Sequence, residues 1–199
     1  MARLLYSILL SVLIPIIVLR MLVRARKAPA YGKRWWQRFG VFTSPKTLNG
    51  KQGGIWFHTV SVGEFIAAVP LIEQTMLANP DALITITTTT PTGSEQVQKR
   101  FANQLGKQIF HVYLPYDLPW FLRGFLRKVK PQLLVILETE LWPNLIHCSK
   151  QSGCKVLVVN ARLSEKSAKG YAKVAGLAKD MLTKLDGLAV QNKVDAQRF

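Results

Sequence analysis

The sequence predicts an α/β domain with a mostly parallel sheet and helices on both of its faces, preceded by an apolar N-terminal helix. From Ile55 onward, short apolar runs alternate with amphipathic stretches, which is typical of successive strand–helix–strand units. Before them, the segment from Leu4 to Leu19 has no charged residue and is almost wholly apolar. With 199 residues and 49% hydrophobic content, the chain can form one sizeable core but is short for two.

The apolar segment lies between Arg3 and Arg20 and is slightly shorter than the roughly 20 residues that a membrane-spanning helix needs. Residues 21–23 extend it if Arg20 reaches toward lipid headgroups. A cleaved signal peptide is disfavoured because no small-x-small cleavage site precedes the charged stretch. We therefore predict that residues 1–23 form a single-pass or signal-anchor helix. A helix lying in the membrane interface and a soluble core helix are the alternatives.

Residues 24–54 are predicted to form a basic juxtamembrane segment followed by a linker. The chain has a net charge of +16, and no carboxylate precedes Glu64. By the positive-inside rule, cations after the apolar run keep the bulk of the chain on the cytoplasmic side, against an anionic membrane surface. Nucleic-acid binding and a merely solvated charge run are the weaker alternatives. The cations are Arg20, Arg24, Arg26, Lys27, Lys33, Arg34 and Arg38, interleaved with Tyr31, Trp35, Trp36 and Phe39.

Residues 55–199 are predicted to form the α/β domain itself. Its strands are short apolar or β-branched runs, and the run at 133–137 is continuously apolar, as in strands that are buried on both faces. The expected strands are Ile55–Val60, Leu83–Thr89, Ile109–Leu114, Leu133–Leu137, Lys155–Val159 and Leu188–Val190.

Amphipathic stretches between these strands predict the helices of the domain. The Asn-Pro-Asp sequence at 79–81 ends the first helix. Thr92 and Glu95 have the spacing of a capping box, which predicts the start of the second helix. The expected helices are Glu64–Leu77, Thr92–Leu105, Leu118–Val129, Trp142–Gln151, Glu165–Leu185 and Val194–Phe199.

In parallel sheets, functional residues gather in the loops that follow the carboxyl ends of the strands. Glu64 lies in such a turn, at a helix N-terminus that favours its ionised form. It is either a catalytic base or simply a favourable acid in the first helical turn. Glu138 and Glu140 follow the most apolar strand, where they either contact a substrate or pair with Arg or Lys.

Other motifs carry less information. No Gly-x-Gly-x-x-Gly segment and no phosphate-binding P-loop is present. The hydroxyl-rich turn at 87–94 favours a helix cap over an anion site. His58, His111 and His147 lack metal-ligand spacing, so no metal site is expected. Cys148 and Cys154 indicate reduced thiols of a cytosolic domain.

Several longer motifs occur in a fixed order along the chain. Together they resemble the bacterial 3-deoxy-D-manno-octulosonic acid (Kdo) transferases of lipopolysaccharide synthesis, over essentially all 199 residues. The motifs are Lys27-Ala28-Pro29-Ala30-Tyr31 with Arg34-Trp35, Val60-Ser61-Val62-Gly63-Glu64, Thr89-Thr90-Pro91-Thr92-Gly93-Ser94-Glu95, Leu114-Pro115-Tyr116-Asp117-Leu118-Pro119, Glu138-Thr139-Glu140-Leu141-Trp142-Pro143-Asn144 and Asn160-Ala161-Arg162-Leu163-Ser164.

The resemblance implies the Rossmann-like N-terminal half of an inverting, metal-independent glycosyltransferase of the GT-B architecture. Such an enzyme moves Kdo from CMP-Kdo onto the tetra-acylated disaccharide precursor of lipid A, at the cytoplasmic side of the inner membrane, without a cofactor. The resemblance makes Glu64 the general base and Glu138 an auxiliary acid that stabilises the transition state. The expected acceptor-binding residues are Lys33, Arg34, Arg38, Ser61, Gly63 and Arg162.

The expected partners are the lipid A precursor, CMP-Kdo and an anionic membrane surface, and not nucleic acid. The resemblance places the start of a C-terminal, donor-binding domain at Phe199, where this chain ends. We therefore expect the chain alone to be inactive. A non-catalytic, membrane-anchored module that binds anionic lipid is the alternative of a different class.

Overall fold

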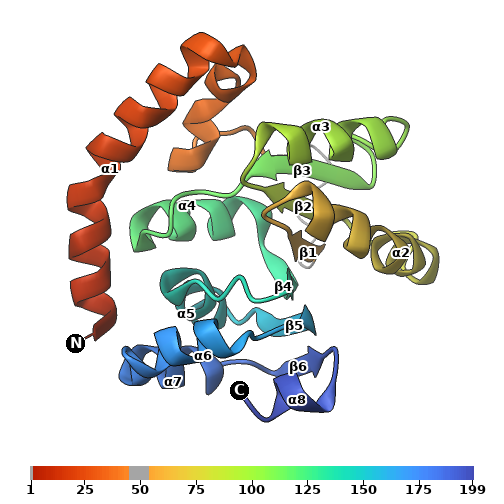
Figure 1. Ribbon diagram of the computed structural model, residues 1–199. Helices are drawn as coiled ribbons and strands as arrows, with labels where there is room; N and C mark the ends of the chain where they lie inside the picture. Colours follow the sequence, from red (N-terminus) through yellow and green to blue (C-terminus); the bar gives the residue numbers. More distant parts are fainter. Residues whose placement is uncertain (1, 45–53) are drawn as a thin grey trace.

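The computed structural model describes residues 2–44 and 54–199, and its centre is a six-stranded sheet with helices packed around it (Figure 1). All strand pairs are parallel, and the strand order is β3-β2-β1-β4-β5-β6. The predicted fold class is therefore confirmed. The strands are β1 Gly54–His58, β2 Ile84–Thr88, β3 Ile109–Tyr113, β4 Pro131–Leu137, β5 Lys155–Ala161 and β6 Gly187–Val190.

The helices cover both faces of the sheet. α2 and α3 contribute to the core on one face, and α4, α5 and α7 contribute to the core on the other. The helices are α1 Ala2–Lys27, η1 Pro29–Gly32, η2 Trp35–Phe39, α2 Val62–Ala78, α3 Pro91–Arg100, α4 Pro119–Val129, α5 Pro143–Gln151, α6 Glu165–Ala172, α7 Ala175–Leu182 and α8 Lys193–Ala196, with η denoting 3-10 helices.

β1 and β4 lie side by side at the centre of the sheet, with His58 aligned to Ile136. The chain winds outward from β1 through β2 to β3, and then from β4 in the opposite direction to β6. The strand order thus reverses between β1 and β4. In open parallel sheets, ligands bind in the crevice outside the carboxyl ends of the strands at this reversal. The loops after β1 and β4 are therefore the candidate ligand site.

The continuously apolar strand β4 contributes to both cores, as its sequence predicts. Leu134 and Ile136 belong to the core that includes Phe125, whereas Val135 and Leu137 belong to the opposite one. Successive side chains of a strand point to opposite faces, so only a strand covered on both sides tolerates such a run. Burial on both faces fixes the register of β4 and hence the position of the loop that follows it.

The predicted helix at Glu165–Leu185 is wrong, because the structure has two helices there. Val174 adopts a non-helical conformation, with φ −122° and ψ 38°, and its N–H bonds the Tyr171 carbonyl oxygen at 3.0 Å. This is a tight turn of the 3-10 type. Gly170 and Gly176 flank the break, and glycine is a poor helix former. The chain therefore turns after α6 and begins α7 in a new direction.

The predicted capping box at Thr92 and Glu95 is also wrong. The N-cap of α3 is Thr90, whose Oγ1 accepts a hydrogen bond from the N–H of Gly93 at 3.1 Å. Pro91 occupies the first helical position, where its fixed φ and missing N–H cost least. The helix begins earlier than predicted and also ends earlier, at Arg100 rather than Leu105.

α1 extends to Lys27 rather than ending near residue 23, so its last turns contain Arg24 and Arg26. It runs along one side of the domain (Figure 1). Within the described residues it is the one helix long and apolar enough to cross a membrane, which is weak evidence of membrane association.

The segment after α1 packs on the domain. The Lys128 ammonium bonds the carbonyl oxygens of Gly40 and Phe42 at 2.9 Å each, and the Tyr113 N–H bonds the Gln37 side chain at 3.1 Å. Most of the predicted linker, residues 45–53, lies outside the described residues, and Gly54 belongs to β1.

Candidate active site at the sheet reversal

Glu64 lies in the first turn of α2, directly after β1, and is only 6% exposed. Its carboxylate accepts three hydrogen bonds. The Val60 N–H donates to Oε2 at 2.7 Å, and the Ser61 N–H and Oγ donate to Oε1 at 3.1 and 2.8 Å. In return, Ser61 Oγ accepts from the Glu64 N–H at 3.3 Å. Ser61 and Glu64 thus form a capping box at the start of α2, which was not predicted from the sequence.

These contacts leave Glu64 with proton-accepting capacity. Oε1 has two protein donors, whereas Oε2 has one, so Oε2 keeps a lone pair for a further donor. Burial raises the pKa of Glu64, the Glu140 charge adds to that rise, and the hydrogen bonds from Val60 and Ser61 oppose it. A carboxylate with a raised pKa is a stronger base than an exposed one, so the capping role and a catalytic role are compatible.

The loop after β4 brings two further carboxylates, Glu138 and Glu140, to this edge. Glu138 has φ +56°, a left-handed conformation that is uncommon for residues other than glycine. Its N–H bonds the Val159 carbonyl oxygen at 2.9 Å. Glu140 accepts a hydrogen bond from the Trp142 indole N–H at 2.8 Å, and it is Glu140 whose charge acts on the pKa of Glu64. The sequence left open whether Glu140 contacts a substrate or pairs with Arg or Lys, and within the described residues it forms no salt bridge.

The predicted basic residues gather at the β2–β3 end of the same edge. Arg34 and Arg38 lie 5.0 and 4.6 Å from the ring centroid of Tyr113. Arg34 also bonds Ser94 Oγ, and Arg38 donates to the Thr89 carbonyl oxygen at 2.7 Å. Burial lowers the pKa of Arg38. Neither arginine forms a salt bridge within residues 2–44 and 54–199, so both can pair with an external anion.

A cavity of about 400 Å³ opens beside these arginines. It presents the cationic groups of Lys33 and Arg34 next to hydroxyl and amide groups that can hydrogen-bond a phosphate. Its lining residues are Ala30, Lys33, Arg34, Trp36, Pro91, Ser94, Glu95, Gln98 and Tyr113. Tyr113 and Gln98 were missed as site residues, whereas Ser94 belongs to the hydroxyl-rich turn at 87–94, for which the sequence favoured a helix cap over an anion site. Only the position of Tyr113 at a strand end could have indicated it.

Hydrogen bonds connect the basic and acidic parts of the edge. Thr89, whose carbonyl oxygen binds Arg38, donates through its Oγ1 to the Val60 carbonyl oxygen at 3.1 Å. The N–H of the same Val60 binds Glu64. The arginines and the candidate base are therefore held on one backbone framework.

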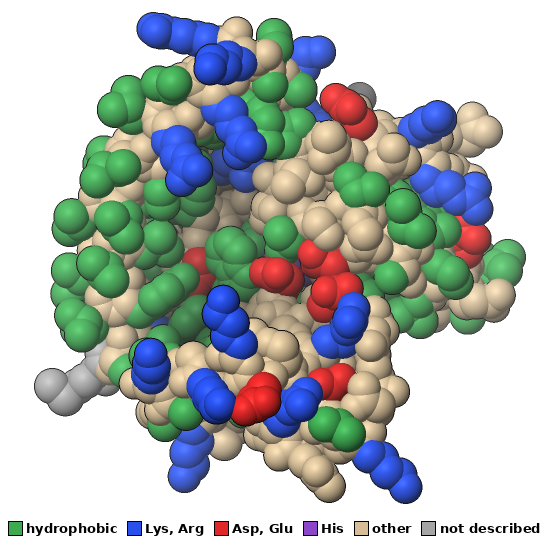
Figure 2. Space-filling view, viewed as in Figure 1, with side chains coloured by type: hydrophobic (Ala, Val, Ile, Leu, Met, Phe, Trp, Pro, Cys, Tyr) green, Lys and Arg blue, Asp and Glu red, His purple; other side chains and the backbone are tan. Residues whose placement is uncertain are grey.

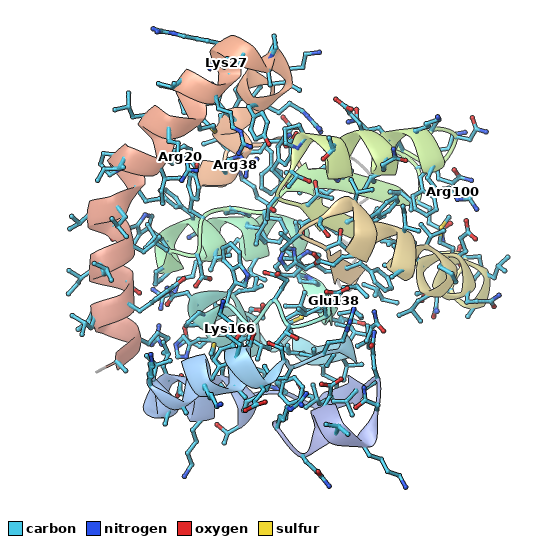
Figure 3. All side chains as sticks on the ribbon, viewed as in Figure 1. Arg20, Lys27, Arg38, Arg100, Glu138 and Lys166 are labelled. Carbon is cyan, nitrogen blue, oxygen red and sulfur yellow. The ribbon has the colours of Figure 1, made fainter. Side chains whose placement is uncertain are left out.

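The remaining predicted residues lie on the acidic side. Gly63 is exposed, and a Cβ placed on it would meet only Ser61 Oγ, at 3.8 Å. The packing of the domain therefore does not require glycine, and the space beside the turn is open. Arg162 has an exposed side chain, and its carbonyl oxygen accepts a hydrogen bond from the Thr139 hydroxyl. In the view of Figure 3, Arg38 lies between α1 and the sheet, and Glu138 lies lower, near the ends of β4 and β5.

An apolar cavity of about 550 Å³ lies between α1 and the rest of the domain. Trp142, the indole of which binds Glu140, forms part of its wall, so the cavity adjoins the carboxylates. Figure 2 shows a hollow beside α1 with acidic side chains at its inner end. The cavity is lined by Tyr6, Leu10, Ile17, Tyr116, Asp117, Leu141, Trp142, Pro143, Tyr171, Val174, Leu177 and Met181.

Metal-ligating residues do not cluster. In the described part of the chain, no group of three or more His, Cys, Asp or Glu side chains could hold a metal ion. His58 and His111 are buried in the sheet and bond Thr87 and Ile86, and burial lowers their pKa values to about 3 and about 4. Both cysteines are buried free thiols.

The comparisons with known proteins agree with these observations. Residues 33–199 match the family described as 3-deoxy-D-manno-octulosonic-acid transferase (kdotransferase). A 3-deoxy-D-manno-octulosonic acid transferase of Haemophilus influenzae is 38% identical over 199 residues, covering 100% of this chain and 45% of that protein. A probable mitochondrial 3-deoxy-D-manno-octulosonic acid transferase of Arabidopsis thaliana is 33% identical over 187 residues, covering 93% of this chain and 40% of that protein.

A bifunctional glycosyltransferase/methyltransferase of Fusobacterium nucleatum is 35% identical over 146 residues, which are 73% of this chain and 22% of that protein. The chain thus spans less than half the length of these curated relatives. The family match covers most of the chain, and it includes both the Ser61–Glu64 turn and the loop after β4. The chain therefore belongs to the Kdo transferase family of glycosyltransferases.

Proposed function

We propose that this chain is the acceptor-side half of a Kdo transferase, an inverting GT-B enzyme that transfers Kdo from CMP-Kdo to a tetra-acylated lipid A precursor. The observation that carries this proposal is Glu64, a buried carboxylate with a raised pKa and a free Oε2 lone pair, at the point where the strand order reverses. A base within hydrogen-bond reach of a sugar hydroxyl contributes about 10²- to 10⁴-fold to the rate of transfer.

In the proposed reaction, the acceptor hydroxyl oxygen forms a bond to the anomeric carbon of Kdo while the bond from that carbon to the CMP phosphate breaks. The hydroxyl proton passes to Glu64 Oε2, and CMP leaves with the bonding electron pair. Attack on the face opposite the leaving group inverts the configuration. Glu138 and Glu140, on the neighbouring loop, support the developing positive charge on the sugar. The proposed reaction uses no metal and no cofactor.

The proposed acceptor is a phosphorylated lipid, and the domain has one surface that suits its phosphates and another that suits its acyl chains. The unpaired arginines Arg34 and Arg38, with Lys33, suit its phosphates. The cavity beside Trp142 suits an acyl chain because its lining is mostly apolar, and it lies between α1 and the carboxylates. The remaining assigned residues are Ser61 and Gly63, in the turn before Glu64, and the exposed Arg162, in the loop after β5.

The substrates are tested by incubating the purified full-length protein with CMP-Kdo and the tetra-acyl disaccharide and detecting the product by mass spectrometry. The expected product is the disaccharide extended by Kdo. Another activated sugar, such as UDP-glucose, serves as the control donor and should give no product. Transfer from UDP-glucose but not from CMP-Kdo would overturn the proposed donor.

A second candidate function is a non-catalytic module that binds anionic lipid at the membrane. The three hydrogen bonds that tie Glu64 to its own turn favour it, because a capping role alone would explain them. Both candidates use the inner-membrane surface on the cytoplasmic side. Lipid binding should survive Glu64→Gln under both candidates. Only the transferase has a turnover rate, and Glu64→Gln should lower it strongly.

A further inference from the structure

α1 is attached to the domain near both of its ends. Close to the N-terminus, Asn144 of α5 donates a hydrogen bond to Ser7 Oγ at 3.0 Å and accepts one from the Arg3 guanidinium at 3.2 Å. Close to the C-terminus, Met21 is only 8% exposed, and the Arg24 guanidinium lies 4.7 Å from the ring centroid of Tyr31 in η1. From Arg3 to Arg24 the helix rises roughly 30 Å. The contacts therefore span most of its length.

The N-terminal attachment is a buried polar network. Asn144 is fully buried, and its Nδ2 also donates to the Asp117 carbonyl oxygen at 2.6 Å. The Asp117 carboxylate accepts from the backbone N–H groups of Asn144 and Leu145, at 3.0 and 2.7 Å, and so caps α5. Breaking such a network leaves buried polar groups without partners, which is costly. We call the set Arg3, Ser7, Asn144 and Asp117 the polar latch.

The residues of α1 that face the domain recur every three or four positions. The centre of this side is formed by Arg3, Ser7, Leu10, Ile14, Ile17, Met21 and Ala25, and it is flanked by Tyr6, Ser11 and Val18, which are also only partly exposed. This spacing defines one stripe of a helix. Ser7 belongs to this stripe and bonds Asn144, so the polar latch holds α1 rotated with the stripe toward the domain.

The opposite side of α1 is a continuous apolar surface, which Figure 2 shows along the outer edge of the molecule. Contiguous exposed surfaces of this kind mark contacts with a membrane or a partner. Its members, 39% to 69% exposed, are Leu4, Leu5, Ile8, Leu9, Val12, Leu13, Ile16, Leu19, Leu22 and Val23.

The occupant of this surface is a lipid leaflet, because the groups around it are those of a membrane interface. Arg20, Arg24, Arg26 and Lys27 follow the apolar stretch, and Figure 3 shows Arg20 and Lys27 on the C-terminal half of the helix. The exposed indoles of Trp35 and Trp36 come next. Cations attract anionic headgroups, and tryptophan prefers the boundary between headgroups and acyl chains.

A membrane-spanning arrangement conflicts with the contacts of α1. The hydrocarbon core of a bilayer is about 30 Å thick, so a spanning α1 would leave few of its residues outside it. α1 contacts α5 through Arg3 and Ser7, and its Leu10 and Ile17 line a cavity that α7 also lines. A spanning path would draw α7, with Lys179 and Asp180, toward the hydrocarbon, where charged groups are strongly disfavoured.

We propose that α1 is an in-plane anchor. It lies in the interface of one leaflet, with its outer apolar surface among the acyl chains and its inner stripe held to the domain by the polar latch. This mode of attachment does not depend on the reaction that the protein catalyses. It keeps the apolar cavity and the carboxylate edge beside the lipid surface, where a lipid can enter sideways.

The depth of outward-facing positions distinguishes the two arrangements. Leu5→Cys, Val12→Cys and Leu19→Cys each replace an exposed side chain, and Cys148 and Cys154 are buried, so the background labelling of the native thiols is low. Each variant of the full chain is nitroxide-labelled and bound to vesicles that contain phosphatidylglycerol. Collision with oxygen and with a water-soluble nickel complex then reports the depth.

The in-plane anchor predicts the same depth for all three labels, within the upper acyl region. A spanning helix would place Val12 deepest and the other two near opposite surfaces, and this result would overturn the proposal. A second measurement uses Ala2→Cys and Lys27→Cys with a membrane-impermeant maleimide added outside intact vesicles. Equal labelling supports the in-plane anchor, whereas labelling of Ala2→Cys only after detergent treatment would contradict it.

Discussion

We predict that His111 makes the domain sensitive to acid. It is 7% exposed on β3, with Nδ1 2.9 Å from the Ile86 carbonyl oxygen and Nε2 2.9 Å from Ser94 Oγ. The Arg34 guanidinium donates to the same Ser94 Oγ. In the arrangement that satisfies every group, Nδ1–H donates to Ile86 and Nε2 accepts from the Ser94 hydroxyl. A second proton on the ring would sit at Nε2 and displace the Ser94 hydroxyl hydrogen.

The size of the effect follows from the pKa of His111, which burial and then the Arg34 charge lower from 6.5 to about 4 in the folded chain. Because the pKa of His111 is depressed in the folded chain, the contribution of the neutral ring to folding stability is complete above pH 6.5. That contribution is lost as the pH falls from 6.5 toward 4, since the unfolded chain binds the proton first. A difference of about 2.5 units corresponds to about 3 kcal/mol. His58, with a pKa lowered to about 3, acts in the same direction.

The assay is denaturant unfolding of the detergent-solubilised chain at several pH values between 4 and 7.5. His111→Gln is expected to flatten the dependence of unfolding free energy on pH, whatever its effect on stability at neutral pH. His147→Gln is the comparison variant: burial also lowers the pKa of His147, which is only partly buried on α5, so its replacement should flatten the pH dependence less than His111→Gln does. A pH dependence in His111→Gln equal to that of the unsubstituted chain would refute the reasoning.

Three further predictions concern binding and attachment. Arg38→Ala should weaken binding of the lipid acceptor by about 2 kcal/mol, the typical contribution of a hydrogen bond to a charged group. Arg100→Ala, which removes an exposed salt bridge, should leave acceptor binding unchanged. The KM for the acceptor checks both variants. Trp142→Phe removes the bond to Glu140 and should lower kcat with little change in thermal stability, and an unchanged kcat would exclude a role for that bond. Deleting residues 1–23 should shift the protein toward the soluble fraction and leave a weak attachment to anionic vesicles, which salt abolishes. If the attachment that remains after the deletion resisted salt, it would not be electrostatic.

The strands and the functional edge could be predicted from the sequence, because their signals are local. A continuously apolar run such as 133–137 indicates a strand covered on both faces, and parallel strands bring their following loops to one edge. In this way the sequence placed Glu64 and Glu138 at that edge, where the structure has them, and their catalytic roles stay predictions. Helix ends were predicted less well. Thr92 and Glu95 match a capping box in spacing, but Pro91 moves the start of α3 to Thr90.

Contacts between distant parts of the chain left no signal in the sequence. Arg34 and Arg38 meet Tyr113 only after the sheet has formed, and Asn144 meets Ser7 across 137 positions. The inner stripe of α1 was invisible for a different reason. Most of the helix surface is apolar, and Ser7 and Ser11 are too few for hydrophobic periodicity to mark the side that packs on the domain.

The central claim is that Glu64 accepts the proton of the acceptor hydroxyl, and the single-turnover rate of Kdo transfer by Glu64→Gln in the full-length protein tests it most directly. Glutamine is compatible with a capping box, so the fold should persist. Glu73→Gln, on the same helix but exposed and paired with Arg100, is the matched control. We predict that Glu64→Gln lowers the rate by about 10²- to 10⁴-fold while Glu73→Gln leaves it unchanged. A rate for Glu64→Gln close to that of the unsubstituted protein would show that Glu64 only caps α2.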